Sequence, residues 1–465
     1  MHSLSRFSHV FDLGDAVALY HSLRMKPVFL SKDTYQSLRD YLVGSFYDSQ
    51  LPVELQSVIT QLQKYKIITN TPEEDEKVLQ FVRGMVPSPH INVCYMILSE
   101  QCNLACKYCF LGNNDAKKRS HFNLQNMTAE TADKGIAYFI RQIKNSSPLP
   151  STNKPILIFY GGEPLVNYST LVYIAKKINT LREVEPCIKN LEMSVITNGI
   201  LLDDEKIQTL SDLGVGIGIS IDGFTEEENQ MRVDTSGKTT FSRVLTTLNR
   251  CKTLGVNVSL SVTLSEETVR HPQHVLNLIK EYDIQSLGFN ILMSSDTFNV
   301  SNQYNEDASQ FIIDTFVDLR KLGVYEDRMM RKLDAFAKSQ IYFSDCAATS
   351  GGQIVIAPDG SVGICHGCLY NKDYFISNVS DAQFDCTQDG TFKEWASLTP
   401  INRNECLDCP ALGICGGGCP INARSLKAGN TIHSMDTRFC VHSKKTLEFL
   451  IHDLYRIISK NTFHQ

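Results

Sequence analysis

Apolar and polar residues alternate along most of the chain in two distinct periods. Between residues 91 and 291, short apolar runs typical of buried strands are separated by stretches with apolar residues every three to four positions, as on a helix face. Repeated strand–helix units of this kind predict a parallel sheet covered by helices, and six such strands predict an open, partial α/β barrel. The predicted strands are Ile91–Leu98, Ile156–Tyr160, Glu192–Ile196, Val215–Ile221, Val256–Val262 and Ser286–Ile291, and the predicted helices span 129–145, 169–182, 204–213, 240–254 and 273–281.

The first 75 residues follow a different pattern and predict a small winged-helix-like α+β module. Two helical patterns follow three short β-like segments, and Asp33 is the expected N-cap of the first helix. The acidic, proline-containing stretch Asn70–Lys77 suits a solvated connection to the barrel. The three β-like segments are Phe7–Val10, Ala16–Leu19 and Val28–Leu30.

The rest of the chain divides into four further parts. We expect the barrel domain over 88–305 and a helical bridge over 306–345. The region 346–442 is rich in glycine and cysteine and has few periodic segments, so it predicts a loop-rich domain held together by metal. Residues 443–465 close the chain with a helical pattern.

Length, charge and the absence of long apolar runs limit the classes of function. At 465 residues the chain is too long for one small core, so two or three domains are expected. The net charge is −6 and the basic residues are scattered, which argues against a nucleic-acid partner. Without a signal-peptide pattern or a membrane-length apolar run, we expect a cytoplasmic protein with no membrane partner, whose fifteen cysteines are thiols rather than disulfides.

The first cysteine motif is a C-x3-C-x2-C sequence directly after the first predicted barrel strand. It consists of Cys102, Cys106 and Cys109. Three thiolates on one short loop can wrap a 4Fe-4S cluster and leave its fourth iron without a protein ligand. An iron without a protein ligand can bind a chelating cofactor, so we expect one at this site.

Together with Tyr108 and the sequence GGEP at Gly161–Pro164, this motif resembles the radical S-adenosylmethionine (radical SAM) superfamily over roughly residues 91–291. The resemblance implies that SAM binds the open iron and that an electron from the reduced cluster splits its sulfonium, giving a 5'-deoxyadenosyl radical. It implies that Glu163 or nearby carbonyls meet the SAM ammonium, and that Ser220 and Arg232 hold its carboxylate. The SAM-binding residues expected from the resemblance are Tyr108, Gly161, Gly162, Glu163, Asn198, Ser220 and Arg232.

Seven further cysteines near the C-terminus read C-x13-G-x4-C, C-x2-C-x5-C-x3-C and a final C. This spacing resembles the SPASM domain, which carries two auxiliary 4Fe-4S clusters and brings the expected total to three clusters. A structural zinc site is the alternative, since C-x2-C is also a zinc spacing. The resemblance assigns Cys346, Cys365 and Cys419 to a proximal cluster near the substrate, and Cys406, Cys409, Cys415 and Cys440 to a distal cluster.

Two features around Cys365 depart from the relatives. No cysteine lies between Cys346 and Cys365, so the proximal cluster has three assigned ligands. Cys368 could supply the fourth ligand, or the iron could stay open to bind a substrate thiolate. His366 stands where anaerobic sulfatase maturases typically place an acidic base, and a histidine with an ordinary pKa near 6.5 could accept the proton there.

Most SPASM relatives modify peptides, and the N-terminal module resembles the element that peptide-modifying enzymes use to hold a precursor's leader segment. The leading hypothesis is therefore a radical SAM maturase that installs a thioether or carbon–carbon cross-link in a ribosomally made precursor peptide. Its expected partners are that precursor with its leader and a flavodoxin- or ferredoxin-type electron donor. The alternatives are a formylglycine-generating sulfatase maturase, a peptide epimerase, and a non-catalytic electron carrier or peptide-binding scaffold.

Overall fold

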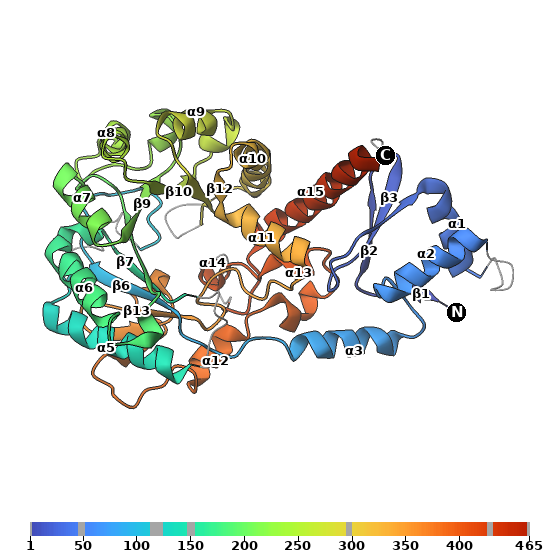
Figure 1. Cartoon of the computed structure of the whole chain (residues 1–465), viewed down its shortest axis with the longest axis horizontal. Coiled ribbons are helices and arrows are strands. Elements are labelled where there is room, and N and C mark those ends of the chain that lie inside the picture. Colours follow the sequence, from blue (N-terminus) through green and yellow to red (C-terminus); the bar gives the residue numbers. More distant parts are fainter. Residues whose placement is uncertain are drawn as a thin grey trace.

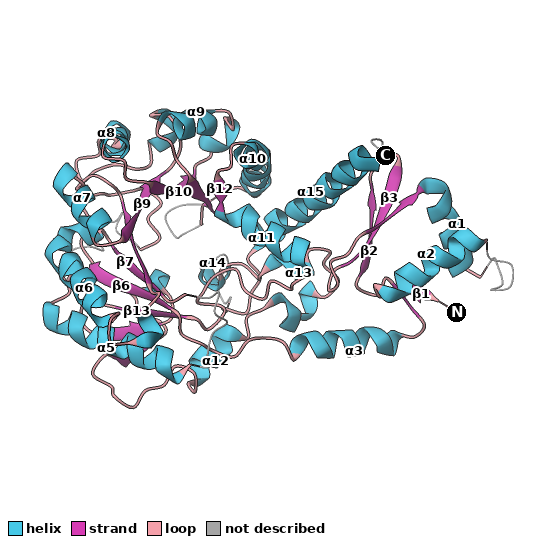
Figure 2. Ribbon diagram, viewed as in Figure 1, coloured by secondary structure: helices cyan, strands magenta, loops and turns pink. Residues whose placement is uncertain are grey.

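The computed structural model describes residues 2–44, 52–111, 124–146, 154–293, 300–425 and 431–462. It consists of a large α/β barrel part and a small N-terminal module at opposite ends of the molecule (Figure 1). The long C-terminal helix and one connecting helix run between these two ends (Figure 2). The cysteine-rich segments lie between the barrel and the module.

The six predicted barrel strands all form and pair in parallel, which confirms the partial α/β barrel. Each is followed by a helix on the outside of the sheet (Figure 2). The strands are β6 (Val93–Ser99), β7 (Ile156–Gly161), β8 (Glu192–Thr197), β9 (Val215–Ile221), β10 (Val258–Leu264) and β11 (Ser286–Ile291). The helices between them are α5 (Ala129–Asn145), α6 (Tyr168–Leu181), α7 (Asp204–Asp212), α8 (Phe241–Thr253) and α9 (His274–Glu281).

The barrel core is formed where the helices cover the strands. Phe159 of β7 and Val195 of β8 are fully buried, as are Ile174 and Ile178 on the inner face of α6. Burying each such side chain contributes about 1.5–3 kcal/mol, so the apolar periodicity of the sequence is also the main source of this domain's stability.

The sheet is longer than the sequence pattern predicts, because short strands extend both of its edges. β12 (Tyr325–Glu326) pairs with β11, and β13 (Gln353–Ile356) pairs in parallel with β6. β14 (Ser361–Gly363) and β15 (Phe375–Asn378) then continue the sheet in antiparallel fashion. The segment that carries Cys346 and Cys365 therefore lies beside the strand that leads to Cys102.

The N-terminal module has the expected α+β composition. β2 (Ser8–Asp12), β3 (Ala16–His21) and β4 (Val28–Ser31) form an antiparallel sheet. The N-cap of the first helix is Ser31, which accepts a hydrogen bond from the backbone of Thr34; the prediction of Asp33 was wrong by two positions, since its side chain lies in the first turn. The helices are α1 (Lys32–Leu42) and α2 (Val53–Lys64), and β1 (Ser3–Leu4) pairs with β5 (Ile68–Thr69).

The stretch Asn70–Lys77 is exposed or half-buried, as expected for a solvated connection, and most of it belongs to helix α3 (Pro72–Arg83). Proline fits the first turn of a helix, where its missing N–H has no partner to lose, and the acidic residues that follow it favour the positive helix N-terminus. Val78, Leu79 and Val82 are buried on this helix. α3 runs from the module toward the barrel and crosses the expected boundary at residue 75 (Figure 1).

The C-terminal half contains more regular structure than the sequence pattern predicts. The helical bridge consists of two helices, α10 (Asn302–Lys321) and α11 (Asp327–Lys338), interrupted by β12. The final helix α15 (Thr437–Thr462) begins earlier than expected, so Cys440 lies in its first turn. The short helices of the cysteine-rich region are α12 (Gly390–Ala396), α13 (Leu412–Cys415) and α14 (Pro420–Ser425).

The N-terminal module packs on the loop that carries Cys406 and Cys409. Arg6 forms an ion pair with Asp408 at 2.6 Å. Phe7 and Leu23 share an apolar cluster with Ile401, Leu407, Leu412 and Cys406. The module is therefore fixed to the cysteine-rich region. In the described part of the chain, no helix is both long and apolar enough to cross a membrane.

His21, on β3 of the module, should make stability depend on pH. The side chain is fully buried, and burial, with a smaller contribution from Arg24, lowers its pKa to about 3. Since this is below the ordinary value, the unfolded chain binds the proton more readily, and the stability present above about pH 6.5 is lost as the pH falls toward 3.

From pH 7 to pH 5 this single histidine should cost about 2 kcal/mol of unfolding free energy. Anaerobic urea unfolding of the wild type and of His21→Gln measures it, and the stability difference between the two proteins should shift by that amount in favour of the variant at pH 5. An unchanged difference would contradict the assignment.

Candidate functional site

The structure brings the ten motif cysteines together in the three predicted groups. All fifteen cysteines of the chain are free. In the first group, burial is the main cause that raises the pKa of Cys102 to about 12 and of Cys106 to about 11, and the neighbouring thiols of the group contribute in the same direction. In the other two groups Cys365 interacts with Cys346 and Cys419, and Cys440 interacts with Cys406, Cys409 and Cys415.

A cavity of about 630 Å³ joins the first group and the proximal group. It opens at the carboxyl ends of the barrel strands, where active sites of such barrels form. The distal group lies outside this cavity. All seven SAM-binding residues expected from the sequence line the cavity; among its other lining residues are Cys102, Cys106, Cys109, Cys346, Cys365, Cys419 and His366.

The two glycines after β7 allow the backbone to pack directly on the cysteine loop. Gly161 has a φ of +146°, and a Cβ there would lie 2.2 Å from the carbonyl oxygen of Ser99. A Cβ on Gly162 would lie 2.5 Å from the carbonyl oxygen of Gln101, next to Cys102. No side chain fits at either position, so these glycines fix the start of the cysteine loop against the neighbouring strand.

Glu163 is buried and holds the turn after the next strand. Its carboxylate accepts hydrogen bonds from Leu165 N (3.0 Å), Thr197 Oγ1 (2.7 Å) and Asn198 N (2.8 Å). The Asn198 side chain in turn donates to Asn103 Oδ1 at 2.7 Å, inside the cysteine loop. The carboxylate is thus held within the protein by three hydrogen bonds while the residue still lines the cavity.

Arg232 and Tyr108 meet at Asp222, a residue that the sequence reasoning did not select. The Tyr108 hydroxyl donates to Asp222 Oδ1, and Arg232 Nε donates to the same oxygen at 3.0 Å. Arg232 Nη2 also donates to the Tyr108 hydroxyl at 3.1 Å. Asp222 follows β9 directly, in the same ISIDG segment as Ser220. Its position at the carboxyl end of a barrel strand is the sequence feature that could have identified it as a candidate site residue.

Removing the charge of Asp222 should destabilise the site strongly. Asp222 is fully buried and Arg232 nearly so, and breaking a buried ion pair typically costs about 3–5 kcal/mol. We expect Asp222→Asn to lower the unfolding free energy by roughly that amount, measured by anaerobic urea unfolding. Tyr108→Phe, which keeps the ion pair, should cost only about 1–2 kcal/mol. Equal losses in the two variants would contradict the role of the charge pair.

His366 lies in an aromatic environment rather than beside an acidic partner. Its ring stacks on Tyr95 with centroids 4.4 Å apart and contacts the edges of Tyr160 (5.0 Å) and Phe110 (5.8 Å). Burial lowers its pKa to about 4. Burial among these rings favours the neutral form of the imidazole, so His366 accepts a proton less readily than an exposed histidine would.

The donor set of these groups suits iron–sulfur clusters. Each group consists of cysteine thiols that the fold brings together, and thiolates are the ligands of a 4Fe-4S cluster. Among the described residues, no three His, Cys, Asp or Glu side chains stand close enough to hold a single metal ion.

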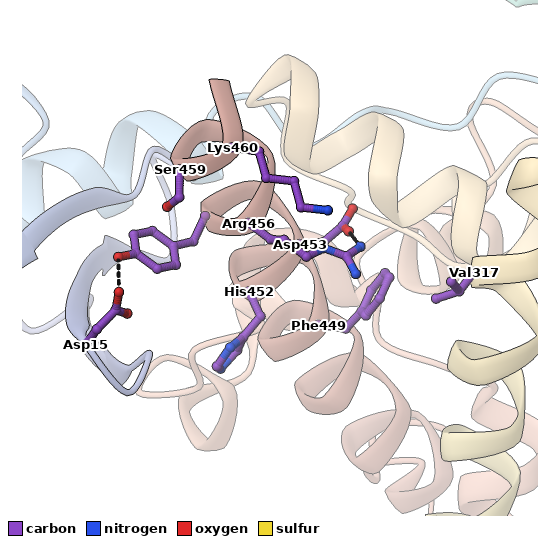
Figure 3. Close-up of a pocket in the computed structure, with 9 residues that line it drawn as sticks. Asp15, Val317, Phe449, His452, Asp453, Arg456, Ser459 and Lys460 are labelled. Atoms are coloured by element: carbon purple, nitrogen blue, oxygen red, sulfur yellow. Dashed lines mark hydrogen bonds and ion pairs between the residues drawn. The ribbon is translucent and has the colours of Figure 1, made fainter. Parts of the chain in front are cut away.

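A second hollow of about 510 Å³ lies between α10, α15 and the turn that joins β2 to β3 (Figure 3). Tyr455 donates to Asp15 at 3.2 Å across it, and Asp453 is paired with Arg320 at 2.6 Å and with Arg456. No cysteine lines this hollow, so it has no part in the cluster sites.

Fold and site together define an enzyme built on a partial α/β barrel with a thiol-lined cavity for an inorganic cofactor. The model of the radical SAM superfamily matches residues 96–279. The radical SAM cyclopropyl synthase TigE of Paramaledivibacter caminithermalis is 25% identical over 482 residues, covering 96% of this chain and 95% of that protein. The chain therefore carries a radical SAM domain over these residues and is similar over nearly its whole length to an enzyme of that superfamily.

Two further comparisons bear on the function. A cysteine-type anaerobic sulfatase-maturating enzyme of Clostridium perfringens is 24% identical over 345 residues, covering 71% of this chain and 89% of that protein. The crystal structure of Streptococcus suis SuiB bound to the precursor peptide SuiA has a TM-score of 0.50 at 14% identity, covering 94% of this chain and 99% of that one. The likeness to SuiB concerns the fold alone.

Proposed function

We propose that this enzyme is a maturase that installs a cross-link, a thioether or a carbon–carbon bond, in a ribosomally made precursor peptide. The observation that carries the proposal is the single cavity shared by Cys102, Cys106 and Cys109 with Cys346, Cys365 and Cys419. A substrate in this cavity would lie between the site of radical generation and a site that can accept an electron. Cross-linking at an unactivated C–H bond needs both a radical that abstracts the hydrogen and an acceptor for the electron left over.

The chain's own residues would bind and orient the cofactors. When bound, a 4Fe-4S cluster on the first cysteine group together with SAM supplies a 5'-deoxyadenosyl radical. Arg232 is fixed on Asp222 by Nε and lines the cavity together with Ser220, so its guanidinium is placed to bind a carboxylate there. Cys346, Cys365 and Cys419 would hold a proximal cluster, and Cys406, Cys409, Cys415 and Cys440 a distal one.

The cross-linking reaction balances if two hydrogens and their electrons leave the peptide. One hydrogen atom is abstracted from a carbon, and a proton leaves the second reacting atom as the new bond forms. One electron then remains in excess, which is the reason to expect redox-active auxiliary sites. A flavodoxin- or ferredoxin-type protein would supply the electron that starts the reaction.

The N-terminal module would hold the precursor's leader segment. In its described sheet, β2 and β4 each pair only with β3, so both outer edges are open to an added strand. Strand addition uses backbone hydrogen bonds for affinity and tolerates varied sequences. SuiB, whose fold is similar over nearly the whole chain, has been solved with its precursor peptide.

Sulfatase maturation is the second candidate, supported by the relative from Clostridium perfringens. Two observations favour the peptide cross-link over it. The match to the radical SAM cyclopropyl synthase TigE covers 96% of this chain, against 71% for the sulfatase maturase. His366, at the position of the expected acidic base, is a buried neutral ring with its pKa lowered to about 4.

Anaerobic co-expression with candidate precursor peptides, followed by fragmentation mass spectrometry, tests the proposal. Each cross-link should lower the peptide mass by two hydrogens and suppress fragmentation between the joined residues. An unchanged mass with deuterium taken up from solvent would indicate epimerisation instead. Conversion of a cysteine or serine in a sulfatase peptide to formylglycine, with no modified precursor, would contradict the proposal.

A further inference from the structure

Cys368 lies at the end of a short turn that brings it back to Cys365. After β14, residues His366–Cys368 form a single 3-10 turn. The backbone N–H of Cys368 donates to the carbonyl of Cys365 at 3.1 Å, which closes this turn. Cys368 is 1% exposed, and its thiol lies beside that of Cys365.

No other cysteine outside the three groups has such a neighbour. Cys94 and Cys251 are buried in the barrel core, and Cys187 packs against it. Cys386 is also buried, and its sulfur lies 3.9 Å from the Tyr138 hydroxyl. These four are ordinary buried or half-buried thiols, whereas Cys368 faces a thiol of the proximal group.

The proximal group is one ligand short of the distal one. Cys406, Cys409, Cys415 and Cys440 offer four thiols, but the proximal group assigned from the sequence has three. A 4Fe-4S cluster with four thiolates has no iron open to exchange, and C-x2-C is a common spacing for two of its ligands. We infer that Cys368 is the fourth ligand of the proximal auxiliary cluster.

This assignment rests on the proposed function, because it requires the proximal cluster to exist. The assignment also specifies how the proximal cluster relates to the substrate, because a fully ligated cluster has no vacant iron that could bind a substrate thiolate. The proximal cluster would then accept an electron without holding the substrate, and the peptide need not present a free cysteine to it. Of the two possibilities left by the sequence, an open iron and a Cys368 ligand, the contact with Cys365 favours the second.

The test uses the full chain with Cys102, Cys106 and Cys109 changed to alanine, so that only auxiliary clusters remain. Into this background are placed Cys368→Ala and, as a matched control, Cys386→Ala, a buried thiol with no cysteine neighbour. The background should hold about eight iron atoms per chain. Mild anaerobic oxidation should leave the background and the control without a 3Fe-4S electron paramagnetic resonance signal.

The Cys368→Ala variant should give that signal from the labile fourth iron, or lose about four iron atoms, while its circular dichroism stays unchanged. Added 2-mercaptoethanol should suppress the signal by occupying the open iron. Cys368→Ser, which preserves the size of the side chain, should behave in the same way if Cys368→Ala folds poorly.

A Cys368→Ala protein with the same iron content and the same silent spectrum as the background would overturn the assignment alone. A 3Fe-4S signal already present in the background at the level of the variant would do the same, because the site would then be open. Iron for a single auxiliary cluster in the background would overturn both the assignment and the proposed function.

Discussion

Replacing Cys106 by alanine should abolish cleavage of SAM to 5'-deoxyadenosine. Cys106 is the middle cysteine of the first group and lines the cavity with Arg232 and Gly161. Loss of an outer partner of a metal ligand typically costs about 10–100-fold, so loss of the ligand itself should lower the rate by more than about 100-fold. Anaerobic assay with dithionite and chromatographic detection of 5'-deoxyadenosine measures it.

The matched control is Cys187→Ala, a half-buried thiol whose pKa is influenced by no other cysteine. It should retain full cleavage and all of its iron. The Cys106→Ala variant should lose up to about four iron atoms and keep those of the auxiliary clusters. Wild-type cleavage of SAM by Cys106→Ala would mean that the radical is generated elsewhere.

Gly162→Ala should damage the same reaction without removing any ligand. The added Cβ would lie 2.5 Å from the carbonyl oxygen and 2.8 Å from the carbonyl carbon of Gln101, and both are backbone atoms that cannot rotate away. The turn or the cysteine loop must therefore shift. Because a displacement of about 1 Å at a reacting centre can cost about 100-fold, we expect a loss of that size in SAM cleavage.

Gly390→Ala is the control for this glycine, because no atom lies within 4 Å of the Cβ it would add. Gly390 is the first residue of α12, outside the cavity. Its replacement should leave SAM cleavage and iron content unchanged. If Gly162→Ala cleaved SAM as fast as Gly390→Ala, the close approach of the turn to the cysteine loop would not be required for the reaction.

The barrel was predictable because its strands and helices are long and strongly periodic. Val215–Ile221 and Ser286–Ile291 begin and end as predicted, since apolar runs of this length between amphipathic helices have few other interpretations. The short strands β13 and β14 gave no such signal. β13 pairs with β6 and β14 pairs with β13, so both strands depend on a contact between distant parts of the chain that local periodicity does not encode.

The cysteine groups could be predicted from spacing, but the residues that support them could not. Glu163 was selected together with nearby carbonyls as a contact for SAM, and the three hydrogen bonds that its carboxylate accepts within the protein were not foreseen. Asp222 was missed because its importance comes from partners ten and more than one hundred positions away, Arg232 and Tyr108. The sequence also could not predict the environment of His366. Burial among aromatic rings lowers the pKa of this side chain, whereas the sequence alone suggests the ordinary value.

The most direct measurement is iron and sulfide analysis with Mössbauer spectroscopy of the anaerobically isolated wild-type protein, with and without SAM. We predict about twelve iron atoms per chain in three 4Fe-4S clusters, with the spectrum of one iron changed by SAM. Iron for only one cluster, zinc in place of iron, or a spectrum indifferent to SAM would contradict the account.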